Sequence, residues 1–258
     1  MKKICNLTTT HTRNDQRVFL KECLTEKQNY EVHLVVCDEE TDELKDGIYI
    51  HGNKGSKARL GRAVVSALRV YRRAKSINAD IYVFHEYDFL WLALFLKKRS
   101  NILLWDCHED YLSDLLDIRG FLRPFRYVLL YVFKILSHIV VKKLDGCITV
   151  CDKLKTWLLK LNCKNCYVLH NFALKRAFQS IESHNYDEAQ HLLYVGSFEP
   201  LRGIHILIQA LDYCRHKDIR LIIGGYRISK CYKEYCELYS VDNMSVMTAS
   251  ALSYSCTL

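Results

Sequence analysis

The sequence lacks the short motifs of several common enzyme classes. It contains no GxxxxGK[ST] phosphate-binding loop, no HExxH zinc helix and no GxSxG nucleophile turn, and each of these motifs supplies groups that its chemistry requires. The first polar loop, TTTHTRNDQR, has no glycine either, so it is not a dinucleotide fingerprint. Phosphoryl transfer on a P-loop, zinc proteolysis and serine hydrolysis are therefore disfavoured.

The N-terminal segment also lacks the pattern of a signal peptide. Its N-terminus, MKKICNLTTTHTRND, turns polar after four residues and has no small-residue cleavage site. The 12 cysteines are spread over 258 residues, several within apolar runs such as VVC, which favours free thiols in a reducing compartment. We therefore expect a cytoplasmic, globular protein, and its formal net charge of +8 favours anionic partners.

The longest apolar run extends from Tyr127 to Val141 and is interrupted by Lys134 and His138. It is shorter than the roughly 20 residues that cross a bilayer, so we expect no membrane span. Two interpretations stay open: a core helix with a solvated basic rim, or a helix that contacts an anionic membrane peripherally. The basic residues that surround the run are Arg119, Arg123, Arg126, Lys142 and Lys143.

Strand-like runs alternate with helix-like patterns along most of the chain, which is typical of a parallel sheet with crossover helices. Strands are expected at residues 3–7, 31–37, 48–51, 81–85, 102–106, 147–150 and 167–169. Helices are expected at residues 15–28, 59–76, 89–98, 124–141 and 152–161. After a polar linker, a shorter series follows, with a strand at 192–195, a helix at 204–214, a strand at 220–223 and a helix at 229–239. The expected domains are residues 1–170, the linker 171–190 and a partial second domain at 191–258.

Polar residues follow three of the expected strands, where ligands collect in open parallel sheets. His85 and His108 each end or follow such a strand and each precedes a glutamate, Glu86 or Glu109. A histidine in this place can hydrogen-bond to a reacting group while a carboxylate orients it. The loop after the first strand adds His11, Arg13, Asp15 and Arg17. Asp15 is equally suited to cap the following helix.

The turn from Gly196 to Gly203 is the best candidate anion site. A strand ends at Gly196, Ser197 adds a hydroxyl, and Arg202 precedes the next helix, whose N-terminus carries a positive dipole. A plain strand-helix connection is the alternative. Four cysteines at 147, 151, 163 and 166 resemble a zinc array, but only one pair has the tight spacing, so no metal is expected.

The chain resembles the family 4 retaining glycosyltransferases, which have the GT-B fold of two Rossmann-like domains. The resemblance rests on segments that follow one another in the expected order from Lys3 to Gly225. They are KICNLTTTHTRNDQRVFLKEC with YEVHLVV, DIYVFHEYDFLWLALFLKK, ILLWDCHEDY, GCITVCDKLKTWLLK with VLHNF, and LLYVGSFEPLRGIHILIQAL with RLIIGG. It implies a complete N-terminal acceptor-side domain and an incomplete donor-side domain.

The resemblance implies a role for each candidate residue. The donor's diphosphate is expected at Gly196, Ser197, Arg202 and Gly203, the acceptor at Arg13, Asp15, Arg17 and Glu109, and the reacting centre at His108 and His85. The co-substrate is a nucleotide-sugar, and no further cofactor or divalent metal is implied, because basic side chains and helix dipoles neutralise the leaving diphosphate.

Two departures from the family pattern limit this expectation. Ser197 stands where the family often has an arginine, and no Glu-x7-Glu pair follows Arg202. The last 15 residues, from Met244, carry no charge. We therefore interpret the chain as a transferase of cell-surface polysaccharide synthesis that is truncated in its donor domain. A noncatalytic module that binds an acceptor or needs a partner is the alternative, and nucleic-acid binding is disfavoured because the basic residues are scattered.

Overall fold

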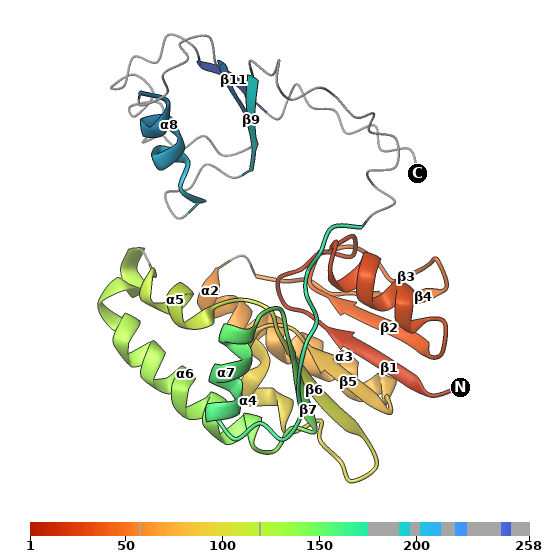
Figure 1. Cartoon of the computed structure of the whole chain (residues 1–258). Coiled ribbons are helices and arrows are strands. Elements are labelled where there is room, and N and C mark those ends of the chain that lie inside the picture. Colours follow the sequence, from red (N-terminus) through yellow and green to blue (C-terminus); the bar gives the residue numbers. More distant parts are fainter. Residues whose placement is uncertain are drawn as a thin grey trace. The chain divides into compact units, whose positions relative to one another are not determined.

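The computed structural model describes residues 1–56, 58–118, 120–174, 191–196, 202–212, 220–225 and 244–248. The chain divides into two compact units, Met1–Ala173 and Leu174–Leu258. Each unit contains a parallel sheet with at least one crossover helix (Figure 1). The helix expected at 229–239 and most of the expected linker lie outside the described residues.

The first unit is built on an eight-stranded sheet in the order β3-β4-β2-β1-β5-β6-β7-β8. All neighbours pair in parallel except β3 and β4. The strands are β1 (Lys3–Leu7), β2 (Glu31–Val36), β3 (Glu43–Lys45), β4 (Ile48–Gly52), β5 (Ile81–Phe84), β6 (Ile102–Cys107), β7 (Gly146–Thr149) and β8 (Cys166–Val168). The order reverses at β1, so the gap between β1 and β5 is the topological switch point at which open α/β sheets bind ligands.

Helices cover both faces of this sheet, which explains why the central strands are apolar throughout rather than alternating. One core cluster joins β1, β5 and β6 to the helices on one face, and a second joins β1, β2 and β4 to the first helical segment. The helical segments are η1 (Val18–Cys23), α1 (Leu24–Glu26), α2 (Arg59–Gly61), η2 (Arg62–Ser66), α3 (Ala67–Ile77), η3 (Tyr87–Phe89), α4 (Leu90–Ala93), α5 (Tyr111–Leu116), η4 (Gly120–Phe125), α6 (Arg126–Val141) and α7 (Asp152–Lys160).

Two elements of the first unit were not expected from the sequence. Strand β3 is three residues long, polar and at the edge of the sheet, so it carries no hydrophobic pattern. Helix α5 begins after Asp110, whose carboxylate accepts a hydrogen bond from the Ser113 N–H at 3.3 Å. Its six residues are too few for a clear helical period.

The apolar helical segment that ends before Lys142 is longer than the run from Tyr127 to Val141 that the sequence indicates. The short helical turn η4 leads directly into α6, and the segment Leu122–Val141 is 20 residues long. Among the described residues it is the one helical segment that is long and apolar enough to cross a membrane, and 22% of it is buried.

The second unit has a three-stranded parallel sheet in the order β11-β10-β9. Its described elements are β9 (His191–Val195), α8 (Ile204–Asp212), β10 (Arg220–Gly225) and β11 (Met244–Thr248). β11 lies in the segment that the sequence distinguished only by its lack of charge. Ile204, Ile208 and Leu221 are fully buried, so one face of α8 supplies a core for this part of a Rossmann-like domain.

Candidate functional site

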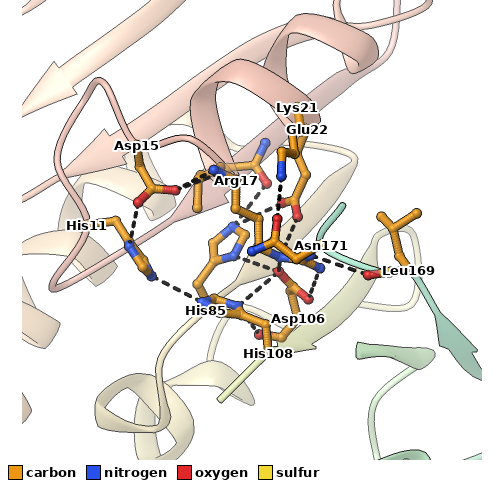
Figure 2. Close-up of polar contacts among 12 residues, drawn as sticks. His11, Asp15, Arg17, Lys21, Glu22, His85, Asp106, His108, Leu169 and Asn171 are labelled. Atoms are coloured by element: carbon orange, nitrogen blue, oxygen red, sulfur yellow. Dashed lines mark hydrogen bonds and ion pairs between the residues drawn. The ribbon is translucent and has the colours of Figure 1, made fainter. Parts of the chain in front are cut away.

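The candidate site lies at the carboxyl ends of β1, β5 and β6. The loop after β1 contributes His11, and His85 follows β5. Asp106 lies near the end of β6, and His108 follows that strand. The His11 and His108 rings lie 5.2 Å apart, and the His85 and His108 rings 5.9 Å apart. Three segments that are distant in the sequence thus meet at the switch point (Figure 2).

Asp106 is the centre of this cluster and is fully buried. The Arg17 guanidinium donates two hydrogen bonds to it, from Nε to Oδ2 and from Nη2 to Oδ1, both at 2.8 Å. His108 Nδ1 and His85 Nδ1 also contact Oδ2, at 3.1 and 3.2 Å. Burial opposes ionisation of Asp106, but the hydrogen bonds from His108, His85 and Arg17 outweigh it and hold its pKa well below the usual range. One carboxylate therefore orients both imidazoles.

A hydrogen-bonded chain connects Asp106 to the first loop. His108 Nε2 lies 3.2 Å from His11 Nε2, and His11 Nδ1 lies 2.9 Å from Asp15 Oδ2. Burial lowers the pKa of His11, but the hydrogen bond to Asp15 and the charge of Glu86 raise it more, to about 9. His11 is therefore an imidazolium at neutral pH that donates to Asp15 and to His108. His108 in turn donates from Nδ1 to Asp106, which fixes its tautomer.

Two buried carboxyl groups, Glu22 of η1 and Glu26 of α1, lie close to this cluster. Glu22 contacts the Arg17 Nε at 3.0 Å, and burial together with the nearby Asp106 charge raises its pKa. Glu26 accepts a hydrogen bond from Asn6 Nδ2 at 2.6 Å. Burial raises the pKa of Glu26 to about 7, although the Asn6 hydrogen bond opposes the shift. These groups make the stability of the first unit depend on pH.

We expect the variant E26Q to resist alkaline destabilisation. Below pH 4.5 the Glu26 carboxyl is protonated in both the folded and the unfolded chain, whereas between pH 4.5 and about 7 only the folded chain keeps the proton. Stability is therefore lost as pH rises through this window, by about 3 kcal/mol in all. Urea unfolding at pH 5 and pH 8 should show E26Q gaining stability over the wild type only at pH 8.

The control for this measurement is E39Q, since Glu39 is exposed. It should follow the wild type at both pH values. His11, whose pKa is raised to about 9, contributes stability that is lost above pH 6.5 in all three proteins. An E26Q chain with the wild-type pH dependence would show that Glu26 is already ionised in the folded protein.

A polar pocket opens beside the histidines. It is lined by the first loop, the residues after β5, the start of the long helical segment at 59–77 and the segment after β6. The lining residues are Thr10, His11, Arg59, Arg62, Glu86, Tyr87, Asp88, Glu109, Tyr111 and Asp114. Carboxylates, guanidinium groups and two tyrosines around one cavity suit a polyhydroxylated ligand, whose hydroxyl groups both donate and accept hydrogen bonds.

Asp88 is the least satisfied group of the pocket. Its Oδ2 accepts from Arg62 Nε at 3.3 Å, whereas Oδ1 is buried without a hydrogen-bond partner. Burial raises the pKa of Asp88, and the Arg62 charge opposes this shift. A buried carboxylate oxygen without a partner costs free energy. A ligand hydroxyl at this point would satisfy it.

The predicted acceptor residues fall in different places. Of the four, Glu109 lines the pocket, whereas Arg13, Asp15 and Arg17 do not. Arg13 donates to Asp38 at 2.7 Å and pairs with Glu43 at 2.9 Å, so it ties the first loop to the strand edge. Asp15 accepts from the backbone N–H groups of Arg17 and Val18, both at 2.8 Å, as a helix cap does. Arg17 is engaged with Asp106.

The structure separates the two histidines that the sequence treated alike. His85 is fully buried, and burial lowers its pKa. Its ring lies against Asp106, and Tyr111 donates to its backbone carbonyl at 2.7 Å. His108 is partly exposed and contacts His11, which lines the pocket. Of these two histidines, His108 is thus the less buried one and the one hydrogen-bonded to a residue that lines the pocket.

One group among the described residues has the composition of a metal site. His85, Asp106 and His108 have potential ligand atoms within 4.8 Å of one another. Both oxygens of Asp106 already accept from the Arg17 guanidinium, which supplies the positive charge that a cation would bring. The absence of a metal requirement stays a prediction.

The cysteine array of β7 and β8 carries free thiols. Cys147, Cys151, Cys163 and Cys166 form no disulfide, and they do not form a further metal-type group in the described part of the chain. A hydrogen bond with Cys147 lowers the pKa of the Cys163 thiol to about 7 despite burial. Cys163 is therefore more readily ionised than an ordinary cysteine.

The predicted donor turn lies in the second unit. Gly196 follows β9, Arg202 is exposed, and Ser197 lies outside the described residues. Gly203 has a φ of +71°, and its carbonyl accepts from the Ile206 and Leu207 N–H groups at 2.9 and 3.2 Å. The positive φ explains the glycine just before α8. Arg202 thus stands beside the N-terminus of that helix.

The chain is similar in sequence to one protein family and in fold to several solved structures. A family model described as Glycosyltransferase Family 4 matches residues 20–173, more than half of the chain. Sucrose-phosphate synthase from Thermosynechococcus elongatus has a TM-score of 0.69 at 11% identity, over 96% of this chain and 70% of that one. No curated protein sequence matches the chain.

Two further solved structures share the fold. Anabaena HepE, determined with UDP and glucose, has a TM-score of 0.64 at 14% identity, over 96% of this chain and 69% of that one. Staphylococcus aureus MnaA, determined with UDP, has a TM-score of 0.57 at 14% identity, over 96% and 68%. The predicted α/β, GT-B-like fold class is confirmed.

Proposed function

Since the chain belongs to glycosyltransferase family 4, we propose that it moves a sugar from a nucleotide-sugar donor to a glycan or lipid-linked acceptor, with retention at the anomeric carbon. The polar pocket beside His11 and His108, at the switch point of a Rossmann-like sheet, carries this proposal. Cell-surface polysaccharide synthesis in the cytoplasm is the proposed setting, which agrees with the eight free thiols of the described residues.

We propose distinct roles for the residues of the first unit. The acceptor's hydroxyl groups occupy the pocket and are held by Asp88 and Glu109. His108 contacts the reacting sugar through Nε2 when His11 gives way, because Asp106 keeps the proton on Nδ1. His85 and Arg17 are positioning residues that act through Asp106.

The donor is proposed to bind through the turn before α8. HepE and MnaA were both determined with UDP, so UDP-sugars are the first donors to test. Arg202 and the N-terminus of α8 offer positive charge to the diphosphate. No metal ion and no cofactor other than this co-substrate enters the proposal.

Calorimetry with a panel of UDP- and GDP-sugars tests the donor site. We expect R202A to weaken binding of the preferred donor by about 10- to 100-fold, the loss typical of a hydrogen bond to a charged group. R99A is the matched control, since Arg99 is an exposed arginine of the first unit, and its affinity should equal the wild type's. Equal donor affinity in R202A and R99A would remove the diphosphate from this turn.

A noncatalytic or partner-dependent module is the second candidate. Between Arg202 and Leu258 the sequence has no Glu-x7-Glu pair, so this stretch does not itself supply the acidic residues that the family pattern places beside the donor. This alternative predicts acceptor binding without sugar transfer, and activity only when a second chain is present. A purified monomer that transfers sugar by itself would eliminate it.

A further inference from the structure

Helix α6 exposes an apolar face that the fold of the first unit does not use. Tyr127, Tyr131, Ile135 and Ile139 recur at intervals of four residues, so they form one stripe along the helix. Val128 and Val132 form a neighbouring stripe. All six are between 41% and 66% exposed, and Figure 1 shows α6 beside α4 and α7 with its long axis along the surface of the unit. Soluble proteins rarely leave such a continuous apolar stripe open to water.

The segment of the chain that contains this face carries charges of one sign. From Arg119 to Leu144 the chain contains no aspartate and no glutamate. The basic residues of this stretch are Arg119, Arg123, Arg126, Lys134, Lys142 and Lys143. A second copy of the chain placed on the same face would bring these cations together, which disfavours a symmetric dimer here. A lipid bilayer with anionic headgroups fits both the apolar stripe and the basic residues of this segment, because its interior is apolar and its surface is negatively charged.

The opposite face of α6 holds the helix in the protein. Phe133, Ser137, Val140 and Val141 are buried. The Phe133 ring stacks on Trp157 at 5.9 Å and also contacts Tyr87 and Tyr111, at 5.7 and 6.3 Å. Insertion of α6 across a bilayer would break this cluster, although the segment is long enough to span. The helix is therefore placed to lie in the plane of a membrane rather than to cross it.

We propose that the exposed face of α6 docks the protein on a bilayer that contains anionic lipids. The tyrosines suit the headgroup level, where amphipathic aromatic side chains collect. The valines and isoleucines face the acyl chains, and the lysines after Val141 contact the lipid phosphates. The docking surface extends the proposed function by fixing where a lipid-linked acceptor is met, but it needs neither donor nor acceptor to form.

Vesicle co-sedimentation of the full chain tests the proposal without any nucleotide-sugar. The probes are phosphatidylcholine vesicles with and without phosphatidylglycerol. Binding is expected on the anionic vesicles, with affinity that falls as salt is added. Because no sugar is transferred in this assay, failure of docking and failure of the transferase function are seen separately.

Two variants and two controls define the surface. K142Q/K143Q should weaken binding roughly 25-fold, since each basic residue near an anionic surface contributes about fivefold, whereas the control R72Q/K75Q on α3 should not. Y131S should weaken binding about tenfold, whereas L44S, which changes an exposed leucine of β3, should not. Each variant's circular dichroism and unfolding midpoint report whether it folds.

Several outcomes would overturn the proposal. The first is equal binding of the wild type to neutral and anionic vesicles. The second is a loss of binding in R72Q/K75Q as large as that in K142Q/K143Q. The third is wild-type binding in Y131S. A dimer in solution that Y131S dissociates, with no vesicle binding by the wild type, would assign the face to a second copy of the chain instead.

Discussion

Replacing Asp106 with asparagine is expected to lower the free energy of unfolding by about 3–5 kcal/mol, the usual cost of breaking a buried ion pair. Asp106 is fully buried and accepts both hydrogen bonds of the Arg17 fork at 2.8 Å. An amide cannot balance the guanidinium charge, and it can accept at only one of its two positions. Urea unfolding at pH 7 measures the loss.

A second substitution, at Glu22, tests whether the loss in D106N comes from the missing Asp106 charge. Its pKa is raised because it is buried near the Asp106 charge. Without that charge, Glu22 can ionise and pair with Arg17, from which it lies 3.0 Å. D106N/E22Q should therefore be less stable than D106N, although E22Q alone changes little at pH 7 because Glu22 already holds its proton.

The exposed aspartate Asp42 provides the control. D42N removes an ion pair with Arg73 in which the Asp42 side chain is 47% exposed, so it should cost under about 1 kcal/mol. If D106N were no less stable than D42N, the Arg17–Asp106 pair would not organise the site.

Replacing His108 with alanine is expected to lower sugar transfer by about 10²- to 10⁴-fold, the range for a group that exchanges a proton or hydrogen bond with the reacting centre. The expectation follows from His108's fixed Nδ1–H bond to Asp106 and its contact with the pocket residue His11. Release of nucleotide from the preferred donor, with and without acceptor, measures it.

H51A is the matched histidine control for this assay. His51 lies on β4 and contacts His33 at 2.9 Å, so its loss should leave transfer unchanged. Donor affinity should be the same in both variants, because the proposed diphosphate site is in the other unit. Equal turnover in H108A and H51A would refute the role of His108.

The fold was largely predictable because parallel strands covered on both faces leave continuous apolar runs. Seven strands of the first sheet were placed within one or two residues of their observed ends. β3 was missed because ELK at a sheet edge has no buried side chain, and β11 because Met244–Thr248 was read only as part of an uncharged tail. Such elements are specified by their neighbours rather than by their own residues.

The candidate site was predictable only in part. His85 and His108 were predicted from their places at strand ends, each with its adjacent glutamate as the orienting group. Glu86 instead accepts from the Thr9 N–H at 2.9 Å, and Asp106 orients both rings. Arg59 and Arg62 were missed because their side chains lie on the polar side of a helix, which a sequence pattern cannot distinguish from a solvated face.

The sharing of Asp106 also restricts how this protein can evolve. Arg17, His85 and His108 come from separate segments, yet each uses the same carboxylate. Loss of Asp106 leaves the Arg17 charge unmatched and both rings unoriented, and loss of Arg17 leaves the buried Asp106 charge without its main partner. We therefore expect diverging relatives that keep transfer activity to retain Arg17 and Asp106 together or to replace them together, whereas either histidine can change without breaking this pair.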